Sequence, residues 1–311
     1  MTNLTILTQD LSKNYGSSYA VDNVSLKVPC GTVYGLLGRN GAGKTTIMKM
    51  LLGLVRPSAG SAVVLGMNVE RQIVDILQRT AFVSEGKALY ASLSPTELVH
   101  FARGFYPKWS DKRAELYAQA LEIPMKQRFG SLSRGNQTKV CLLLALCQNA
   151  DLLVFDEPTA GLDPLTVDRL LHILAEDILA EGCTVFFSSH QLAEVEQIAD
   201  WVGILDHGKL LLEARLDDIK DEFRMVTASG NALPERLSSQ VRSVMIDGNF
   251  YRYIVARDAV PFSEDLRRNG ATVIDVSPLS LREIFLQTIS KEEVCTTGNV
   301  GATTRSESSS S

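Results

Sequence analysis

The sequence predicts an α/β domain with a mainly parallel core sheet, followed by a small α+β domain. From Leu4 to about Leu212, short aliphatic or β-branched runs alternate with longer amphipathic stretches, which indicates strands alternating with helices. Strands covered by helices on both faces are almost wholly apolar, and this describes the runs TVYGLL, DLLVFD and CTVFFSS. After Leu216 the pattern changes to short strands and small turns. We therefore expect a first domain at 1–215 and a second at 216–290.

A glycine-rich loop connects the TVYGLL strand to an amphipathic helix. The loop fits the pattern G-x-x-x-x-G-K-[ST], in which backbone N–H groups surround phosphates that larger side chains would keep away. Its residues are Gly38, Arg39, Asn40, Gly41, Ala42, Gly43, Lys44 and Thr45, with Thr46 next in the helix. We expect Lys44 to hold the β- and γ-phosphates of a nucleotide and Thr45 to bind Mg²⁺. The alternative is an incidental glycine-rich turn.

The region from about Ser84 to Phe129 has a predominantly helical pattern. Ser94-Pro95-Thr96-Glu97 combines a capping serine, a proline in the first turn and a glutamate that can bond back to the cap. No strand pattern interrupts this region, so we expect a helical subdomain of about 85–135 inserted in the sheet domain.

The strand DLLVFD ends next to a second acid, so that Asp156 and Glu157 are adjacent. Neighbouring residues of a strand point to opposite faces, which allows the two carboxylates different roles. We expect Asp156 to bind Mg²⁺ and Glu157 to act as the general base that polarises an attacking water. The alternative is a pair of acids that cap the next turn.

Three more elements complete the first domain. Asp163-Pro164 combines a cap and a first-turn proline, and it predicts a helix that runs to about Ala180. His190 closes the strand CTVFFSSH at the edge where open α/β sheets usually bind ligands, which makes it a candidate γ-phosphate sensor and partner of Glu157. A lone histidine in such a place can also be purely structural. The run WVGILDHGKLLLE then predicts a β-hairpin.

The second domain has its own strand and helix signals. The runs VRSVMID and FYRYIVA lie on either side of Gly248-Asn249 and predict a hairpin. We expect a short helix around 263–268, a strand at ATVIDVS and a final helix near 279–290. The tail from Lys291 is small, polar and serine-rich, which predicts disorder.

Composition disfavours several classes of protein. The chain has 311 residues, 45% hydrophobic and 22% charged, which is the balance of an ordinary globular protein. A net charge of −5 and a pI near 5.5 argue against a nucleic-acid partner. The longest apolar runs, such as 140–147, are far shorter than the ~20 residues that span a bilayer. The start MTNLTILTQD lacks the pattern of a secretory signal, so we expect the chain to reside in the cytosol.

The cysteines show no disulfide or metal framework. They are Cys30, Cys141, Cys147, Cys183 and Cys295. No two form a C-x-x-C pair, and none has a histidine at metal-site spacing. We expect reduced and mostly buried thiols.

A segment before an apolar helix carries a family resemblance. Leu132-Ser133-Arg134-Gly135-Asn136 looks like the LSGGQ signature of ABC ATPases. Arg134 replaces a glycine and Asn136 replaces the glutamine, while the other three residues match. Taken alone, the segment is short, and Ser133 could be only a helix cap.

The order of the motifs strengthens this resemblance. The phosphate loop, the signature, DLLVFDE, Ala160-Gly161-Leu162-Asp163 and His190 occur in the sequence typical of ABC ATPases, in which the last two resemble the D-loop and the H-loop. The resemblance covers residues 4 to about 214. It implies a mainly parallel core sheet, an antiparallel β subdomain and an inserted helical subdomain, with ATP and Mg²⁺ as ligands.

Two further residues occupy positions that the family uses. Tyr15 lies where the family stacks an aromatic ring on adenine; the alternative is a packed surface tyrosine. Glu85 lies where the family usually has the Q-loop glutamine. An ionised glutamate accepts but does not donate hydrogen bonds, so it could still contact Mg²⁺ or water. The alternative is a solvated loop glutamate.

The resemblance also implies partners. In ABC ATPases two copies sandwich two ATP molecules, so Ser133 and Gly135 would meet the γ-phosphate held by a second ATPase subunit, and Asp163 would join the nucleotide-binding residues. The segment SPLSLREIFLQTIS, at 277–290, is similar to a motif of exporter subunits whose permease is a separate membrane protein. We therefore expect an ATPase peripheral on the cytoplasmic face of the membrane. The alternative is a soluble ABC ATPase acting on a macromolecular assembly, which the lack of paired ATPase motifs, sustained heptads and basic blocks disfavours.

Overall fold

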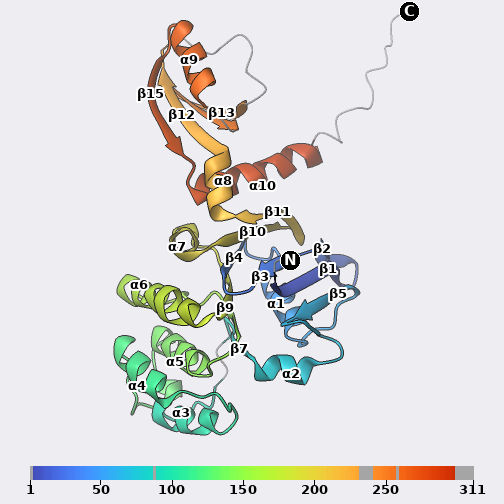
Figure 1. The fold of residues 1–311 in the computed structure, drawn as a ribbon, viewed down its shortest axis with the longest axis vertical. Coiled ribbons are helices and arrows are strands. Elements are labelled where there is room, and N and C mark those ends of the chain that lie inside the picture. The colour runs from blue at the N-terminus through green and yellow to red at the C-terminus, as the bar shows by residue number, and fades with distance from the viewer. Residues whose placement is uncertain (1–2, 87–88, 231–240, 257–258, 298–311) are drawn as a thin grey trace, which may run out of the picture. The chain divides into compact units, whose positions relative to one another are not determined.

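The computed structural model describes residues 3–86, 89–230, 241–256 and 259–297. Its contacts divide the chain into two compact units between Leu216 and Asp217. The elements of both units are labelled in Figure 1.

A six-stranded sheet forms the centre of the first unit (Figure 1). The strand order is β11-β10-β4-β9-β8-β7, and every neighbouring pair is parallel except β10 with β11. The bounds are β4 Val33–Gly38, β7 Thr80–Val83, β8 Leu152–Asp156, β9 Thr184–Ser189, β10 Trp201–Asp206 and β11 Lys209–Arg215. All residues of β4, β8 and β9 are buried. The predicted mainly parallel sheet and the predicted β10–β11 hairpin are confirmed.

A second, antiparallel sheet lies beside it. Its strand order is β2-β1-β5-β6, and β3 pairs with β1. The bounds are β1 Leu4–Tyr15, β2 Ser18–Val24, β3 Lys27–Pro29, β5 Ala59–Val64 and β6 Met67–Asn68. Helix α1, Lys44–Leu51, contributes Ile47, Met48 and Leu51 to a buried cluster that includes residues of both sheets. This packing holds the start of α1 at the end of β4.

The first unit has helices before and after β7. Helix α2, Ile73–Gln78, precedes β7, and α7, Leu192–Ile198, follows β9. Between β7 and β8 lie α3 Pro95–Arg103, α4 Asp111–Ala120, a 3₁₀ turn Phe129–Ser131 and α5 Arg134–Leu146. The capping box predicted at the start of α3 is confirmed, because the Ser94 side chain accepts from Glu97 N and Glu97 accepts from Ser94 N. Ser110 and Ser133 cap α4 and α5 with their side chains alone, which accept from Arg113 N and Asn136 N.

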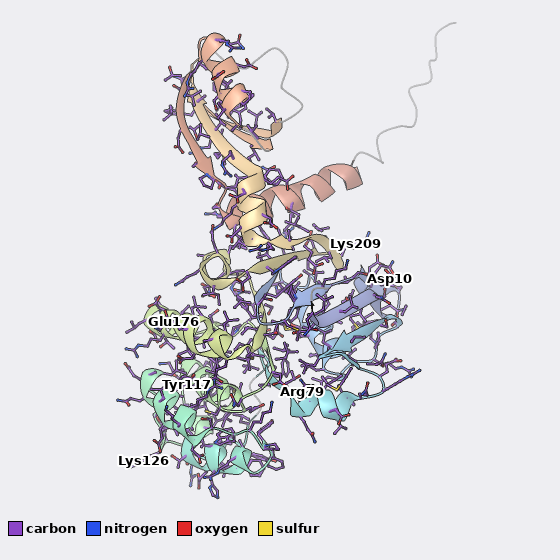
Figure 2. All side chains as sticks on the ribbon, viewed as in Figure 1. Asp10, Arg79, Tyr117, Lys126, Glu176 and Lys209 are labelled. Carbon is purple, nitrogen blue, oxygen red and sulfur yellow. The ribbon has the colours of Figure 1, made fainter. Side chains whose placement is uncertain are left out.

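The helix predicted from Asp163 to about Ala180 is not a uniform α-helix. Helix α6 spans Pro164–His172 and is followed by a π-helical segment Ile173–Ile178 and a 3₁₀ turn Leu179–Glu181. The hydroxyl of Tyr117 on α4 donates to Asp177 in the π segment at 3.1 Å. Tyr117 is labelled among the side chains in Figure 2. The spacing of apolar residues does not distinguish an α-helix, in which each N–H bonds the carbonyl four residues earlier, from a π-helix, in which it bonds the fifth. The sequence therefore predicts a helix here but not its type.

The second unit is an antiparallel sheet with helices. The sheet order is β13-β14-β12-β15, with bounds β12 Phe223–Ser229, β13 Val241–Asp247, β14 Phe250–Ala256 and β15 Thr272–Pro278. The helices are α8 Leu216–Glu222, α9 Val260–Arg268 and α10 Leu281–Thr297. The predicted hairpin at Gly248-Asn249 is confirmed by the pairing of Asp247 with Phe250. Phe262 and Leu266 of α9 pack in a cluster with Tyr253 of β14.

Two predictions for this unit need correction. Helix α9 begins at Val260, earlier than the predicted 263, because a proline is well placed in a first helical turn and Pro261 occupies it. Helix α10 continues to Thr297, so the disorder predicted from Lys291 is wrong for 291–297. The rest of that tail lies outside the described residues.

The thiols are less uniformly buried than expected. Cys147 and Cys183 are buried, Cys141 is half-buried and Cys30 is exposed. Cys30 is exposed because it follows β3 in a turn, where it accepts a hydrogen bond from the Thr5 hydroxyl at 3.1 Å. The side chain of Cys295 lies outside those described. Burial raises the pKa of Cys147 and of Cys183 to about 12, so these two thiols stay protonated.

Across the described ranges, no helix has both the length and the apolar character that crossing a membrane requires.

Candidate active site

The glycine-rich loop connects the carboxyl end of β4 to the start of α1. Gly43 has φ 108°, and a Cβ there would lie 2.3 Å from the carbonyl oxygen of Ala20, so only glycine fits. Lys44 is the first residue of α1, with 6% of its surface exposed. Its Nζ donates to the Gly38 carbonyl at 2.7 Å. The ammonium therefore lies inside the loop that its own backbone forms.

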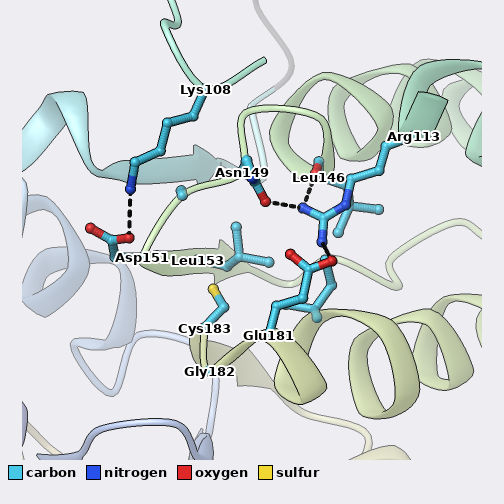
Figure 3. Close-up of a pocket in the computed structure, with 11 residues that line it drawn as sticks. Lys108, Arg113, Leu146, Asn149, Asp151, Leu153, Glu181, Gly182 and Cys183 are labelled. Atoms are coloured by element: carbon cyan, nitrogen blue, oxygen red, sulfur yellow. Dashed lines mark hydrogen bonds and ion pairs between the residues drawn. The ribbon is translucent and has the colours of Figure 1, made fainter. Parts of the chain in front are cut away.

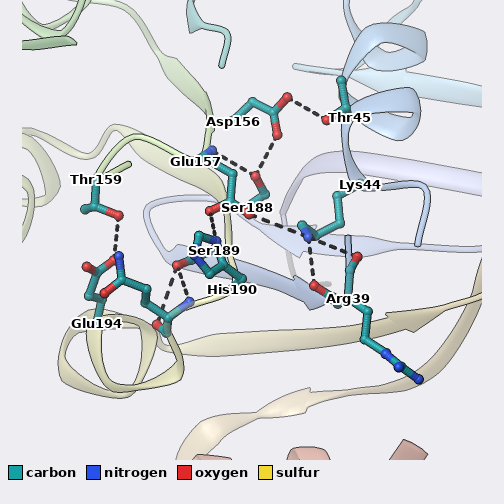
Figure 4. Close-up of polar contacts among 12 residues, drawn as sticks. Arg39, Lys44, Thr45, Asp156, Glu157, Thr159, Ser188, Ser189, His190 and Glu194 are labelled. Carbon is teal, nitrogen blue, oxygen red and sulfur yellow. Dashed lines mark hydrogen bonds and ion pairs between the residues drawn. The ribbon is translucent and has the colours of Figure 1, made fainter. Parts of the chain in front are cut away.

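Asp156 is held at the end of β8 by two hydroxyl groups (Figure 4). Thr45 Oγ1 donates to Asp156 Oδ2 at 2.7 Å, and Ser188 Oγ donates to Asp156 Oδ1 at 2.8 Å. The sheet register causes the second contact, because β8 and β9 pair Asp156 with Ser188. A carboxylate and a hydroxyl thus present oxygen atoms at the first turn of α1.

Glu157 directly follows Asp156, the last residue of β8. Its φ is 52°, a left-handed conformation that costs a non-glycine residue about 1–3 kcal/mol and persists only where the surroundings enforce it. The Glu157 N–H donates to Ser188 Oγ at 3.0 Å. Its carboxylate lies between two nitrogen atoms, with Oε2 2.6 Å from His190 Nδ1 and Oε1 3.5 Å from Lys44 Nζ. With the hydrogen on Nδ1, the imidazole donates to this carboxylate.

These groups surround one cavity of about 450 Å³. Of the predicted site residues, the lining contains Arg39, Asn40, Gly41, Ala42, Gly43, Lys44, Thr45, Thr46, Glu85, Asp156, Glu157 and His190. Gly38 contributes the carbonyl that accepts from Lys44. Ala20 and Ala160 complete the wall. The cavity opens at the carboxyl ends of β4, β8 and β9, which is the ligand edge of an open α/β sheet.

Besides Gly38, four predicted residues lie outside this lining. Tyr15 is 56% exposed, and Lys13 Nζ lies 5.2 Å from the centre of its ring. Ser133 is exposed and caps α5 by accepting from Asn136 N. Asp163 caps α6 by accepting from Thr166 N at 3.0 Å, and the Thr166 hydrogen bonds lower the pKa of Asp163.

Gly135 is the fourth of these residues. A Cβ at this position would lie 2.6 Å from the carbonyl oxygen of Gly161. Gly135 and Gly161 therefore pack backbone against backbone within one chain, and a residue larger than glycine at 135 would clash with the Gly161 carbonyl.

Sequence reasoning missed Ser188, Thr159 and Glu194. Ser188 and Ser189 end the apolar strand β9, and strand pairing with β8 would have placed Ser188 beside Asp156. The Thr159 hydroxyl donates to Glu194 Oε2 at 2.7 Å, and both residues are buried (Figure 4). Burial raises the pKa of Glu194, the hydrogen bond from Thr159 lowers it, and the charge of Glu157 raises it again, so the net shift is upward.

The oxygen atoms at α1 suit Mg²⁺ bound together with a nucleotide. Magnesium prefers oxygen ligands and commonly takes only one or two from the protein, with phosphates and water completing its shell. The Thr45 hydroxyl and the Asp156 carboxylate, 2.7 Å apart, form such a pair. Throughout the described part of the chain, no group of three or more His, Cys, Asp and Glu could hold a metal alone.

A second polar cavity, of about 250 Å³, lies at the opposite edge of the sheet (Figure 3). Its wall includes Asp151 and Cys183, which directly precede β8 and β9. Lys108 donates to Asp151 at 3.0 Å, and Arg113 pairs with Glu181 at 2.6 Å. These oppositely charged side chains already pair with one another, and the pairs join the α4 region to the sheet. We therefore do not consider this cavity a candidate for the catalytic site.

Comparisons with known proteins agree with this geometry. The sequence model of the family described as ABC transporter matches residues 21–160, and a second one, described as an AAA domain, matches 125–196. The chain is 38% identical to the bacitracin transport ATP-binding protein BcrA of Bacillus licheniformis, over 78% of each chain. It is 31% identical to BcrA of Enterococcus faecalis, over 91% of this chain and 96% of that one. Lantibiotic transport ATP-binding protein SrtF of Streptococcus pyogenes is 33% identical, over 67% and 90%.

Solved structures have the same fold. The ATP-binding subunit of an ABC transporter superposes with a TM-score of 0.64 at 28% identity, covering 70% of this chain and 92% of that one. The ATP-binding cassette MJ0796, in a dimeric post-hydrolysis state bound to ADP and Pi, superposes with a TM-score of 0.62 at 22% identity, covering 68% and 98%. The chain therefore belongs to the ABC transporter family, as one of its ATP-binding ATPases.

Proposed function

We propose that the chain binds Mg·ATP in the 450 Å³ cavity and hydrolyses it to drive export through a separate membrane permease. The observation that supports this most strongly is the convergence of Lys44, Thr45, Asp156, Glu157 and His190 on one cavity from three separate segments, the start of α1 and the ends of β8 and β9. An ammonium, a hydroxyl–carboxylate pair and a carboxylate–imidazole pair are the groups that phosphoryl transfer to water requires.

Each group has a distinct chemical role in this proposal. The loop N–H groups and Lys44 bind the β- and γ-phosphates and offset their charge. Thr45 and Asp156 would hold Mg²⁺, which supplies further positive charge to the phosphates when bound, and Glu85 lines the same wall as a third oxygen ligand. Glu157 accepts a proton from the attacking water as general base. His190 fixes the Glu157 carboxylate through Nδ1, and in the imidazolium form its other ring nitrogen also donates and can bond the γ-phosphate.

We propose that a second ATPase subunit completes the site. Ser133 is exposed at the amino end of α5, where backbone N–H groups and the helix dipole favour an anion. Since Ser133, Gly135 and Asp163 do not line the cavity of their own chain, their predicted contact with nucleotide requires the cavity of another copy. Tyr15, exposed near the β1–β2 turn, would stack on the adenine.

An aromatic groove supports a permease partner. A cavity of about 310 Å³ is lined by Tyr90, Phe101 and Phe105, whose exposed fractions are 61%, 47% and 65%. The rings of Phe101 and Phe105 have centroids 5.0 Å apart, so they form one continuous apolar surface. Exposed aromatic clusters of this kind are typical of protein contact sites.

This groove adjoins the nucleotide cavity through one short segment. Ser84 and Gly86 line the groove, while the residue between them, Glu85, lines the nucleotide cavity. A permease segment in the groove would therefore be one residue away from a group that we assign to Mg·ATP. We propose this segment as the route by which ATP binding and permease movement affect each other.

Export is the direction that the relatives support. BcrA of two organisms is described as a bacitracin transport ATP-binding protein, and the second match covers 96% of that relative. The Nod factor export ATP-binding protein I of Burkholderia orbicola is 30% identical over 91% of this chain. We propose that this chain serves a related exporter from the cytoplasmic face of the membrane.

The test is purification of the tagged chain from membranes in mild detergent. We expect a multi-span membrane protein to co-purify in fixed stoichiometry, and ATP hydrolysis by that complex to disappear in Glu157→Gln. Recovery with ribosomes, DNA or a soluble assembly factor instead of a membrane protein would contradict the transport proposal.

A further inference from the structure

The geometry points to Glu194 as a positioning residue for ATP hydrolysis: its bond to Thr159 joins the segment after Glu157 to the helix after His190. This inference rests on the proposed function, because it concerns the reaction assigned to Glu157. Glu194 lies four residues after His190, and Thr159 lies two residues after Glu157.

The two catalytic residues leave different strands at the point where sheet pairing stops. The last β8–β9 pair is Asp156 with Ser188, so neither Glu157 nor His190 has a ladder partner across this junction. The conformation of Glu157, with φ 52°, also requires enforcement by neighbouring contacts. Some contact beyond the sheet must therefore fix the Nδ1–Oε2 distance of 2.6 Å.

Two contacts join the two segments at this junction (Figure 4). On the side of the strands, Ser188 Oγ accepts from Glu157 N. On the side of the loops, Thr159 Oγ1 donates to Glu194 Oε2 at 2.7 Å. His190 lies between these contacts on its segment, and Glu157 makes the first contact itself and precedes the second by two residues, so both backbones are held on two sides.

Glu194 acts through its neighbours and not on the nucleotide. Of the residues described, the cavity wall includes Glu157, Ala160 and His190 but neither Thr159 nor Glu194. Glu194 is 8% exposed and Thr159 is 3% exposed. A buried hydrogen bond excludes competing water, and removal of one partner leaves the other unsatisfied, which makes this contact sensitive to substitution.

The buried acidic side chain at position 194 is explained by its hydrogen bond to Thr159. Burial of a carboxylate is costly, and an apolar side chain would pack at this position of α7 at lower cost. The carboxylate provides an acceptor at a fixed distance from the Thr159 hydroxyl. A displacement of about 1 Å in a catalytic group can lower turnover by up to about a hundredfold, so a bond that fixes the Glu157–His190 pair affects rate more than affinity.

The experiment compares variants of Thr159 and Glu194 in ATP hydrolysis by the purified full-length chain. Thr159→Val and Glu194→Ala each remove the bond, and we expect kcat to fall about tenfold to a hundredfold while the affinity for ATP changes less than about threefold. Glu194→Gln retains an amide oxygen that can accept from Thr159, and we expect it to keep kcat within about threefold of the unsubstituted chain. Thr96→Val removes a hydroxyl that bonds Met125 O at 2.9 Å on α3, and it serves as the matched control with unchanged kcat.

A double variant separates positioning from general loss of structure. If the bond is the cause, Thr159→Val/Glu194→Ala loses no more activity than either single change. An unchanged kcat in Thr159→Val, an equal loss in Glu194→Gln and Glu194→Ala, or a parallel loss of ATP affinity would each overturn the inference. Should Thr159→Val fail to fold, the comparison of Glu194→Gln with Glu194→Ala decides the question. Glu157→Gln is assayed in parallel: if it hydrolyses ATP normally, the proposed function fails before this inference is tested.

Discussion

His190 Nδ1 lies 2.6 Å from Glu157 Oε2, although the two residues are 33 positions apart in the chain. The contact follows from the topology, because β8 and β9 are adjacent parallel strands that end at the same edge of the sheet. The carboxylate oxygen next to His190 is therefore fixed, while Oε1 lies 3.5 Å from Lys44. A carboxylate held in this way is oriented before any water binds.

Loss of the His190 imidazole should lower turnover. We expect His190→Ala to reduce kcat about tenfold to a hundredfold, because Glu157 would lose its orienting donor. In His190→Asn, the side-chain amide nitrogen lies close to the place of Nδ1 and can donate to Glu157, so part of the rate should remain. Steady-state ATP hydrolysis with the two variants checks this order. Equal rates in both would argue against the orienting role.

Lys44 should contribute mainly to nucleotide affinity. A hydrogen bond to a charged group is worth about 1.5–3 kcal/mol, so Lys44→Ala should weaken ATP binding about tenfold to a hundredfold. Equilibrium binding of a fluorescent ATP analogue measures the change. The control is Lys49→Ala, the basic residue in the last turn of α1, which should bind the analogue normally. Unchanged affinity in Lys44→Ala would count against its phosphate role.

The aromatic groove should determine recovery of the permease. Phe105 is 65% exposed on the groove wall, so Phe105→Ser removes apolar contact area for a partner while changing little inside the fold. We expect the amount of co-purified membrane protein to fall at least fivefold. The matched control is Leu116→Ser, which removes a 52% exposed apolar side chain of α4 outside the groove. Comparable recovery of the membrane protein with both variants would contradict the assignment of the groove.

Glu213 should make stability depend on pH. Burial raises the pKa of Glu213, although hydrogen bonds from Lys27 N at 2.8 Å and the Tyr34 hydroxyl at 3.0 Å oppose the shift. The folded state then binds this proton more tightly than the unfolded state. The stabilisation is fully present below the ordinary pKa of 4.5 and is lost as pH rises through the higher folded value.

Glu213→Gln tests this dependence, because the amide cannot ionise and its oxygen can accept from the same donors. The free energy of unfolding of the unsubstituted chain should decrease relative to this variant as pH rises from about 4 to 8. Urea unfolding at several pH values measures it. Glu115→Gln, a change at an exposed position of α4, should leave the pH dependence intact. A constant difference between the unsubstituted chain and Glu213→Gln would refute the prediction.

Much of the first unit was predictable because its signals are local. Strand, glycine loop and helix follow one another in the sequence, so the site of Lys44 and Thr45 could be placed without tertiary information. The pair of acids after β8 was equally clear. The caps of α3 and α6 are short-range hydrogen bonds between residues three apart, and both are present.

The missed features depend on which strands are neighbours. Ser188 lies beside Asp156 only because β9 is adjacent to β8, and the Thr159–Glu194 bond connects residues 35 positions apart. The π segment of Ile173–Ile178 differs from an α-helix by one residue in its hydrogen-bond step, which apolar spacing does not resolve. Helix α10 extends past Lys291 because a polar composition does not by itself end a helix.

Hydrolysis of ATP by the purified chain and by Glu157→Gln, measured together with ATP binding, tests the central claim most directly. We expect Glu157→Gln to bind ATP as the unsubstituted chain does, with turnover lower by about a hundredfold or more, because the amide cannot accept the proton of the attacking water. Near-normal turnover in Glu157→Gln would contradict the assignment of Glu157 as the base and, with it, the mechanism built on this cavity.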